Sequence, residues 1–460
     1  MNKYSTAILL VIFLSIYHEN AISKSTRDKI YNQAHRMYQR HNYFTALDHI
    51  GKQYKYATPD RNAKHLIEKI LEYTGTHYFN TYGDLELRKM NIPETDLIMA
   101  KRNLYLGKFH YGIKRLKRIP STHRLYPEAL LIKGSIYNRQ KNYSKAQKAW
   151  HECSKNAKSK IGIVSEKVSR YFTVIQENCS INIARIMYKK KNFKEALALY
   201  EAIPKRSFQW PYILLEKAWA YYQLGLYNNA IGTLITYNSP LLKSYFTPEA
   251  EVLKALSYYK LCLYDDALDV VENYYKVYKP KSNKLRSVIG NNKKRLYFYN
   301  LMFKPIHAND KKSQFIRNLV TQISKRVKFN LDLNTLYSLN TELVRNDKLS
   351  NKKKVLKIKK DLQEQMNHYV KVSFYKFIND IHFFATEMFN LKLEILSKKR
   401  EFIYKNKVSK KLKRGSLENV ERQSNQEFWT FNNAFWADEL GDYSLGLKSQ
   451  CTRRKGVRND

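Results

Sequence analysis

The sequence predicts an all-α chain of stacked helix pairs, and two observations carry this prediction. The first is a pattern that recurs between residues 127 and 280, in which a small residue is followed at helical spacing by aromatic residues and then by an alanine. Its clearest copies run from Ala218 to Ala230 and from Ala255 to Ala267. The second is the scarcity of turn-forming residues, because 14 Gly and 10 Pro in 460 residues favour long helices with short connections.

The alanines that close each copy set the register of the repeat. They are Ala146, Ala196, Ala230 and Ala267, at spacings of 50, 34 and 37 residues. A period of about 34 residues is typical of tetratricopeptide (TPR) helix pairs, which stack into a right-handed superhelix. The spacing of 50 predicts an insertion, and the polar run 155–167 is its expected place.

Two more helix pairs are expected upstream, and prolines mark the ends of pairs downstream. Ala34, Tyr43 and Ala46 form one of the upstream pairs, and Ala100, Gly107, Phe109 and Gly112 form a weaker one. Pro204, Pro211, Pro240 and Pro248 fall between the proposed pairs, where helices must stop or start. The repeat pattern ends at Pro280.

The composition divides the chain into six segments. These are a signal peptide at 1–23, N-terminal helical and TPR-like repeats at 24–125, core TPR repeats at 126–280, a long helical region at 281–405, a basic linker at 406–425, and a C-terminal aromatic docking segment with a basic tail at 426–460. Amphipathic helices over 312–404 either fold back as a cap or hairpin, or extend as a coiled arm.

The amino terminus has the features of a secretory signal peptide. Lys3 supplies the charged start, residues 7–16 form a short apolar core, and Ala21 and Ser23 are small residues at the positions that precede a cleavage site. The apolar run is shorter than the roughly 20 residues that span a bilayer. We therefore expect cleavage and export to the periplasm, with an uncleaved anchor as the alternative.

Four cysteines allow two disulfide bonds in an oxidising compartment. Cys153 and Cys179 flank the expected insertion, whereas Cys262 and Cys451 would tie the tail to the last repeat. The alternative is that these cysteines are ordinary packing residues. No cysteine or histidine cluster has the spacing of metal ligands, so we expect neither a metal nor a cofactor.

A short aromatic module follows the basic linker. Its large side chains are Phe428, Trp429, Phe431, Phe435 and Trp436. Aromatic residues at this density require cover. Docking of the tail on the helical body of the same chain is favoured over anchoring to a partner.

The net charge of +43 raises the question of nucleic-acid binding. The charge is spread along helices, however, and the abundance of Lys, Asn, Ile and Tyr is typical of AT-rich coding sequences. Nucleic acid is therefore the less favoured partner. A basic surface favours acidic proteins, and peripheral association with anionic membranes stays open.

The repeat register also predicts a partner-binding groove, which in TPR domains is lined by the first helix of each pair. Its expected residues are Asn138, Arg139, Arg185, Tyr188, Lys189, Trp219, Tyr222, Tyr259 and Lys260. Aromatic rings supply contact area and cations supply charge-assisted hydrogen bonds, so this strip suits an acidic or carboxylate-bearing segment. The alternative is that these residues are ordinary solvent-facing side chains. No arrangement of nucleophile and base, paired carboxylates or phosphate-binding loop predicts catalysis.

Two stretches resemble a known family more closely than the repeat pattern alone. One runs from Trp210 to Gly225 and continues through Asn238-Ser239-Pro240 to Tyr264-Asp265-Asp266-Ala267, and the other runs from Phe435 to Tyr443 and on to Ser449-Gln450-Cys451. Both resemble periplasmic TPR proteins of the adventurous gliding motility system of myxobacteria and related predatory bacteria. The resemblance implies a scaffold, without activity of its own, in a periplasmic envelope complex whose other proteins are its partners. A basic helical-repeat protein that binds nucleic acid or anionic envelope polymers is the alternative function.

Overall fold

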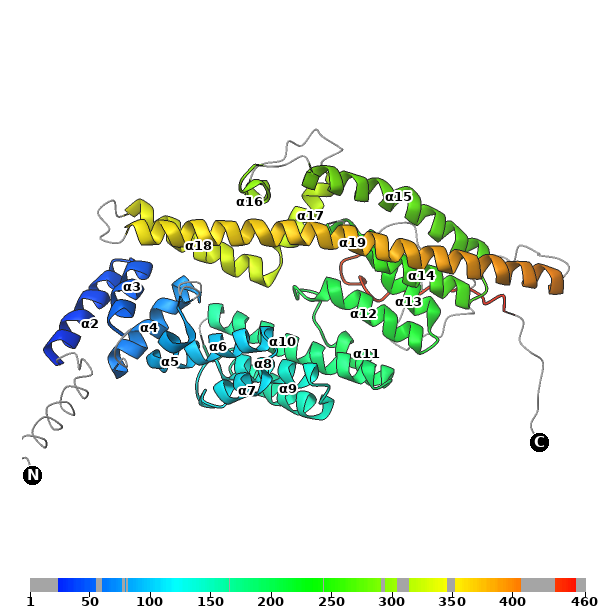
Figure 1. Cartoon of the computed structure of the whole chain (residues 1–460). Coiled ribbons are helices and arrows are strands. Elements are labelled where there is room, and N and C mark those ends of the chain that lie inside the picture. The colour runs from blue at the N-terminus through cyan, green and yellow to red at the C-terminus, as the bar shows by residue number, and fades with distance from the viewer. Residues whose placement is uncertain are drawn as a thin grey trace, which may run out of the picture. The chain divides into compact units, whose positions relative to one another are not determined.

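The computed structural model describes residues 24–54, 60–76, 79, 82–164, 166–242, 244–290, 294–303, 314–345, 352–406 and 435–451. Over these residues the chain consists of α-helices, short 3-10 turns and connections, with no strand (Figure 1). The predicted all-α helical-repeat fold is confirmed. The proposed signal peptide, most of the basic linker and the aromatic residues Phe428, Trp429 and Phe431 lie outside the described residues.

The chain forms two compact units. Unit 1 contains residues 1–176 and 327–365, and unit 2 contains residues 177–326 and 366–460. The helices of unit 1 are α2 (Lys24–Gln39), α3 (Tyr43–Tyr54), α4 (Arg61–Thr74), α5 (Asp84–Met90), α6 (Pro93–Tyr105), α7 (Phe109–Leu116), α8 (Tyr126–Arg139), α9 (Tyr143–Lys158), α18 (Val327–Arg345) and the first parts of α10 (Glu166–Lys189) and α19 (Lys352–Asn406). Unit 2 contains the remainders of α10 and α19 together with α11 (Phe193–Glu201), α12 (Trp210–Gln223), α13 (Tyr227–Ile235), α14 (Pro248–Lys260), α15 (Tyr264–Gly290), α16 (Tyr297–Phe303) and α17 (Gln314–Ser324).

One turn geometry joins the two helices of each pair, and it occurs six times in the described chain. In each copy one residue adopts the left-handed conformation, at φ between 58° and 77°: His41, Gly107, Lys141, Lys191, Gly225 and Cys262. The next backbone N–H then donates to the carbonyl five residues back, as Asn192 does to Met187 at 2.9 Å and Leu263 does to Tyr258 at 3.0 Å. This is the Schellman ending of a helix, which satisfies carbonyls that the last turn leaves unpaired.

The repeat register predicted from the alanines is confirmed by these turns. Five residues after each left-handed residue lies a buried small residue: Ala46, Gly112, Ala146, Ala196, Ala230 or Ala267. The alanines are fully buried. Pro211 and Pro248 stand in the first turns of α12 and α14, where a missing N–H costs no helical hydrogen bond.

The extra residues between Ala146 and Ala196 are largely taken up as helix. α9 has 16 residues and α10 has 24, against 9 and 14 in α13 and α12. Pro280 does not end its helix either, since α15 continues through it to Gly290. The buried side chains of Tyr278, Ser282 and Leu285 hold this helix in place on both sides of the proline.

The helices that follow the repeats fold back onto them within each unit. In unit 1, the carboxylate of Glu342 on α18 accepts hydrogen bonds from the N–H groups of Phe44 and Thr45 at 2.8 and 2.9 Å. N–H groups in the first turn of a helix have no acceptor within that helix, and Glu342 supplies one for α3. In unit 2, the hydroxyls of Tyr274 and Tyr275 on α15 donate to carbonyls of α19 at 2.8 and 2.7 Å. The long helical region is therefore a cap on the repeats in each unit.

The C-terminal segment 435–451, which we call the strap, docks on α12, α13 and α14 of unit 2. Leu440 packs with Trp210, Leu214 and Leu242. The N–H of Gly441 donates to Thr236 Oγ1 at 2.9 Å. Self-docking of the tail is thus confirmed over these residues.

A buried cation and a disulfide bond fasten the strap. Lys217 Nζ donates to the Gly441 carbonyl and to Asp442, each at 3.2 Å. The predicted disulfide bond between Cys262 and Cys451 joins its end to the turn before α15. No cysteine of the chain is free.

Candidate functional site

The predicted groove residues lie in both units, so we describe them separately. In unit 1, Asn138 and Arg139 occupy the last turn of α8. Arg139 is exposed, whereas Asn138 is half-buried. The Oδ1 atom of Asn138 has no hydrogen-bond partner among the described residues.

The remaining seven groove residues belong to unit 2, where several contact one another. The rings of Trp219 and Tyr222 lie 5.6 Å apart, edge to face, and Tyr222 lies 5.4 Å from Tyr227. Tyr188 packs against Phe193 at 5.1 Å, and Tyr259 against Tyr264 at 5.9 Å. The first helices α10, α12 and α14 thus each carry half-buried aromatic rings, Tyr188, Trp219 with Tyr222, and Tyr259, which we call the aromatic row.

Two polar groups of this row have partners within the chain. Arg185 makes a bidentate ion pair with Glu216 of α12, with nitrogen–oxygen distances of 2.6 and 2.9 Å. The Nε1 atom of Trp219 donates to Glu249 of α14 at 2.9 Å. These bonds link successive first helices, which suggests that both residues stabilise the row itself. Sequence reasoning missed the two glutamates because their pairing depends on how repeats stack.

Burial alters the acidity of the tyrosines in the row. Burial, followed by the neighbouring hydroxyls of Tyr227 and Tyr259, raises the pKa of Tyr222 to about 12. Burial also raises the pKa of Tyr259, as does the carboxylate of Glu394 on α19. These hydroxyls remain protonated donors at physiological pH, and α19 borders one end of the row.

Lys189 and Lys260 are the exposed cations of the row in unit 2, together with the half-exposed Arg185. The strap contacts α12 through Trp210 and Leu214, α13 through Asn228, and the end of α14 through the backbone carbonyl of Lys260. None of these contacts of the strap involves Trp219, Tyr222 or Tyr259.

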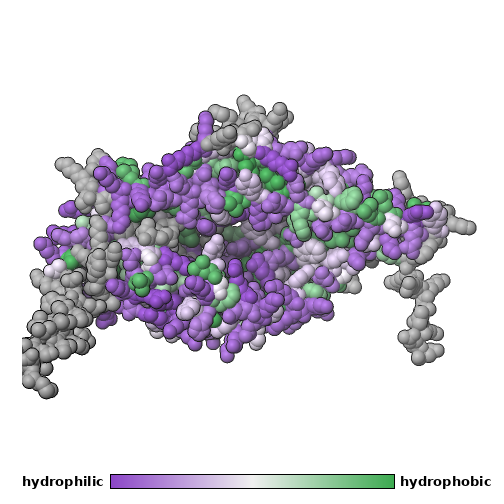
Figure 2. All heavy atoms as spheres, in the orientation of Figure 1, coloured by the Kyte–Doolittle hydropathy of each residue, from purple (hydrophilic) through white to green (hydrophobic). Residues whose placement is uncertain are grey.

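Figure 2 shows apolar atoms gathered over the second half of α19, where Phe389, Leu393 and Leu396 are exposed.

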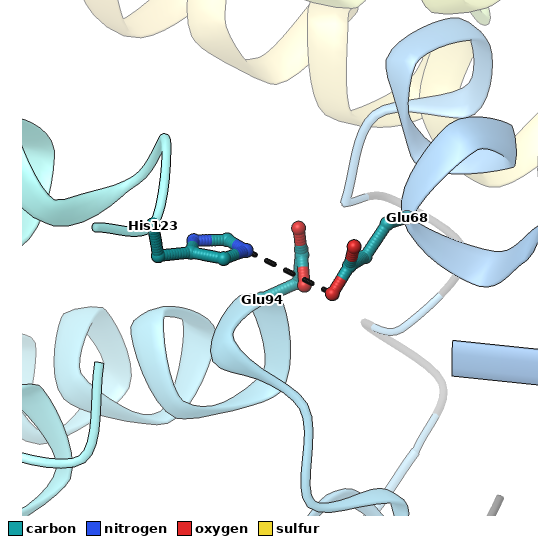
Figure 3. A group of neighbouring side chains, drawn as sticks. All are labelled: Glu68, Glu94 and His123. Atoms are coloured by element: carbon teal, nitrogen blue, oxygen red, sulfur yellow. Dashed lines mark ion pairs between the residues drawn. The ribbon is translucent and has the colours of Figure 1, made fainter. Parts of the chain in front are cut away.

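A second group of polar residues, in unit 1, has the donor set of a metal site. Glu68 of α4, Glu94 of α6 and His123 of the connection before α8 each bring one ligand atom within 4.8 Å of the others (Figure 3). This group could not be recognised from the sequence. Glu94 follows Glu68 by 26 positions and His123 follows Glu94 by 29, and the three residues come from three segments. Only the stacking of helices brings them together.

A small hollow in unit 2 has about 100 Å³ of space and is lined in part by Tyr237, Tyr245, Glu251 and Tyr278. Pockets for small-molecule ligands usually measure about 300–1,000 Å³. This hollow is therefore too small for a typical substrate.

Among the described helices, none combines the length and the hydropathy that a membrane crossing requires.

Comparison with known proteins identifies no family for this chain. No protein-family model matches the chain, and no curated protein sequence matches it either. Among solved structures, the apo form of RapI aligns over 74% of this chain and 98% of its own, with 10% sequence identity and a TM-score of 0.35. A likeness this distant supports no statement about function.

Proposed function

We propose that the chain is a non-catalytic helical-repeat scaffold that binds another protein through the aromatic row of unit 2. The observation that carries this proposal is the row itself, in which Trp219, Tyr222 and Tyr259 are only half-buried although the strap and α19 cover neighbouring surfaces. Tyr and Trp are the side chains that most often anchor protein interfaces. Helical repeats use such rows on stacked first helices to hold extended partners.

The charges around the row favour an acidic partner segment. Lys189 and Lys260 are exposed beside the rings, and protonated tyrosine hydroxyls add further donors. A carboxylate-bearing segment would meet cations and O–H donors while its apolar side chains lie on the rings. The partner's acidity is thus the chemical feature that the row would select.

The finer proposal is that this scaffold is exported to the periplasm and belongs to an envelope complex of the gliding-motility type. The disulfide bond between Cys262 and Cys451 supports export, because such bonds persist in oxidising compartments. The resemblance of the segments around Trp210–Gly225 and Phe435–Tyr443 supports the type of complex. Neither observation names a partner.

A crosslinking pull-down from the native cells, after separation of cytoplasm, periplasm and membranes, tests both parts of the proposal. We expect recovery from the periplasm together with envelope proteins. The double variant Tyr222→Ser/Lys260→Glu should lose these partners while keeping its helicity by circular dichroism. Tyr105→Ser is the matched control, because Tyr105 is an exposed tyrosine of unit 1 that does not belong to the row. Equal recovery of partners by all three proteins would place the binding surface elsewhere.

The net charge of +43 favours one second candidate, binding of nucleic acid or anionic envelope polymers. The same pull-down separates the two candidates. Recovery with RNA from the cytoplasm, or partners that are lost on nuclease treatment, would replace the scaffold proposal with this one.

A further inference from the structure

The cluster of Glu68, Glu94 and His123 in unit 1 is the strongest unassigned group of side chains in the described chain. Glu68 and His123 are already close together, with 3.7 Å between Glu68 Oε1 and His123 Nε2. Glu94 stands beside both, so that all three side chains point toward one another (Figure 3). The group therefore offers two carboxylate oxygens and one imidazole nitrogen to a common point.

Glu94 provides an independent sign of a ligand-binding site. Its side chain is 4% exposed, and its Oε2 atom has no hydrogen-bond partner among the described residues. Its Oε1 atom is 3.4 Å from Nη2 of Arg124. A buried carboxylate oxygen without a partner lowers the stability of a fold. This oxygen is thus available to a further cation.

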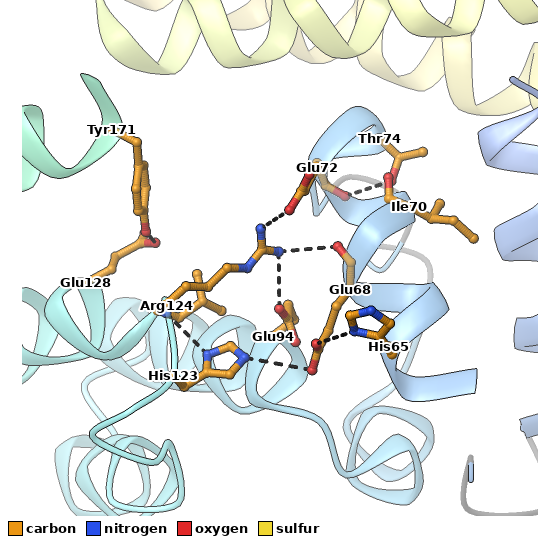
Figure 4. A network of polar contacts seen from close by, with 12 residues as sticks. His65, Glu68, Ile70, Glu72, Thr74, Glu94, His123, Arg124, Glu128 and Tyr171 are labelled. Atoms are coloured by element: carbon orange, nitrogen blue, oxygen red, sulfur yellow. Dashed lines mark hydrogen bonds and ion pairs between the residues drawn. The ribbon is translucent and has the colours of Figure 1, made fainter. Parts of the chain in front are cut away.

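The charges near the cluster are not balanced by the cation present. Arg124 contacts Glu72 at 2.5 Å, the Glu68 carbonyl at 3.2 Å and Glu94 at 3.4 Å (Figure 4). The guanidinium thus contacts the carboxylates of Glu72 and Glu94, and the carboxylate of Glu68 is the third negative group of the cluster and its surroundings. Two negative charges remain when the imidazole is neutral, which is the charge that a divalent cation would neutralise.

We propose that Glu68, Glu94 and His123 bind a divalent transition metal of the Zn²⁺ class. Imidazole nitrogen with carboxylate oxygens is a common donor set for Zn²⁺, with metal–ligand bonds of about 2.0–2.2 Å. Tetrahedral bonds of that length place ligand atoms about 3.3 Å apart. The 3.7 Å between Glu68 Oε1 and His123 Nε2 needs a small inward movement to reach this geometry. A water molecule would complete the shell on the side where Glu68 and His123 are partly exposed.

Metal binding moves one proton on His123. The backbone N–H of Leu125 donates to His123 Nδ1 at 3.2 Å, so the neutral ring carries its proton on Nε2. When Nε2 binds the metal, that proton passes to Nδ1 and the Leu125 contact is given up. The metal would then join α4, the start of α6 and the connection before α8.

Calorimetric titration of the full chain, freed of any affinity tag and of bound metal, with Zn²⁺ tests the proposal. We expect one Zn²⁺ per chain, a rise in the unfolding temperature, and visible absorption bands when Co²⁺ is used instead. Glu94→Gln keeps the shape of the side chain and removes its charge, and His123→Ala removes the nitrogen ligand. Each should weaken binding by about tenfold or more, since even outer-shell changes cost 10–100-fold.

His65→Ala is the matched control. His65 is 3.9 Å from Glu68 but is largely exposed and lies outside the group, so its loss should leave Zn²⁺ affinity unchanged. Circular dichroism establishes that each variant is folded before titration. The absence of stoichiometric binding, or equal binding by the wild-type chain, Glu94→Gln and His123→Ala, would overturn the proposal.

Discussion

Replacing Gly232 of α13 with alanine should displace the strap, residues 435–451, from that helix. A Cβ atom at this position would lie 2.0 Å from the carbonyl oxygen of Tyr443 and 2.7 Å from the nitrogen of Ser444. Both are backbone atoms of the strap, so no side-chain rotation relieves the clash. The strap therefore has to move away by more than an ångström.

The energetic cost follows from the contacts on either side of Tyr443. The bonds from Gly441 N–H to Thr236 and from Leu445 N–H to the Asn228 carbonyl would break, at about 1 kcal/mol each. Loosening of Leu440 in its apolar cluster adds about 1–2 kcal/mol. Alanine gains about 1 kcal/mol over glycine inside a helix. The expected net loss of stability is about 2–3 kcal/mol.

Hydrogen–deuterium exchange of peptides from 435–451, together with urea unfolding, measures this effect. Gly290→Ala is the matched control, because Gly290 is also helical and has no atom within 4 Å of the added Cβ. The control should keep the strap protected and lose no stability. Equal protection of the strap in Gly232→Ala and Gly290→Ala would refute the close contact between the strap and α13.

Three other changes test the disulfide bond, the register and a buried carboxylate. Cys451→Ser should lower the free energy of unfolding by about 2–5 kcal/mol, because the bond to Cys262 closes a long loop; unchanged urea unfolding would contradict this. Ala230→Trp should cost about 3 kcal/mol or more through overpacking, whereas Ala198→Trp at an exposed site should cost little; similar melting temperatures would count against the register. Burial raises the pKa of Glu177, so its pKa in the folded chain exceeds the unfolded value of about 4.5. The wild-type chain therefore loses free energy of unfolding as pH rises through the folded pKa, because the buried carboxyl group must then ionise. Glu177→Gln should therefore be the more stable protein at pH 7 and lose this advantage near pH 4 in denaturant titrations, whereas an advantage independent of pH would contradict the reasoning.

The repeat register was predictable because it depends on local chemistry. A helix pair needs a small residue where its helices cross, and Ala146, Ala196, Ala230 and Ala267 supply it at a fixed offset from the turn. The turn between the two helices was harder to recognise in the sequence. Glycine marks its left-handed position in only two of the six copies, and Lys141 and Lys191 adopt the same conformation in others.

Contacts between distant segments were beyond the reach of sequence reasoning. The bond from Glu342 to the start of α3 spans 297 and 298 residues, and the pair of Arg185 with Glu216 depends on the stacking of α10 on α12. Glu68, Glu94 and His123 likewise show no motif spacing. The tail was an exception, because its dense aromatic residues and the possible pairing of Cys451 with Cys262 both indicated that it docks.

The disulfide bond of the strap also decides how the chain would carry mechanical load. Cys262 and Cys451 are 189 residues apart in sequence, and a pull on the chain beyond Cys451 passes through the sulfur atoms to the turn before α15. The residues between the two cysteines are then bypassed and bear no tension. Fully extended, these residues would span about 660 Å, at about 3.5 Å per residue, but they cannot extend under force until a reductant breaks the bond. Under tension, the end-to-end length of the protein would therefore depend on whether this one bond is oxidised or reduced.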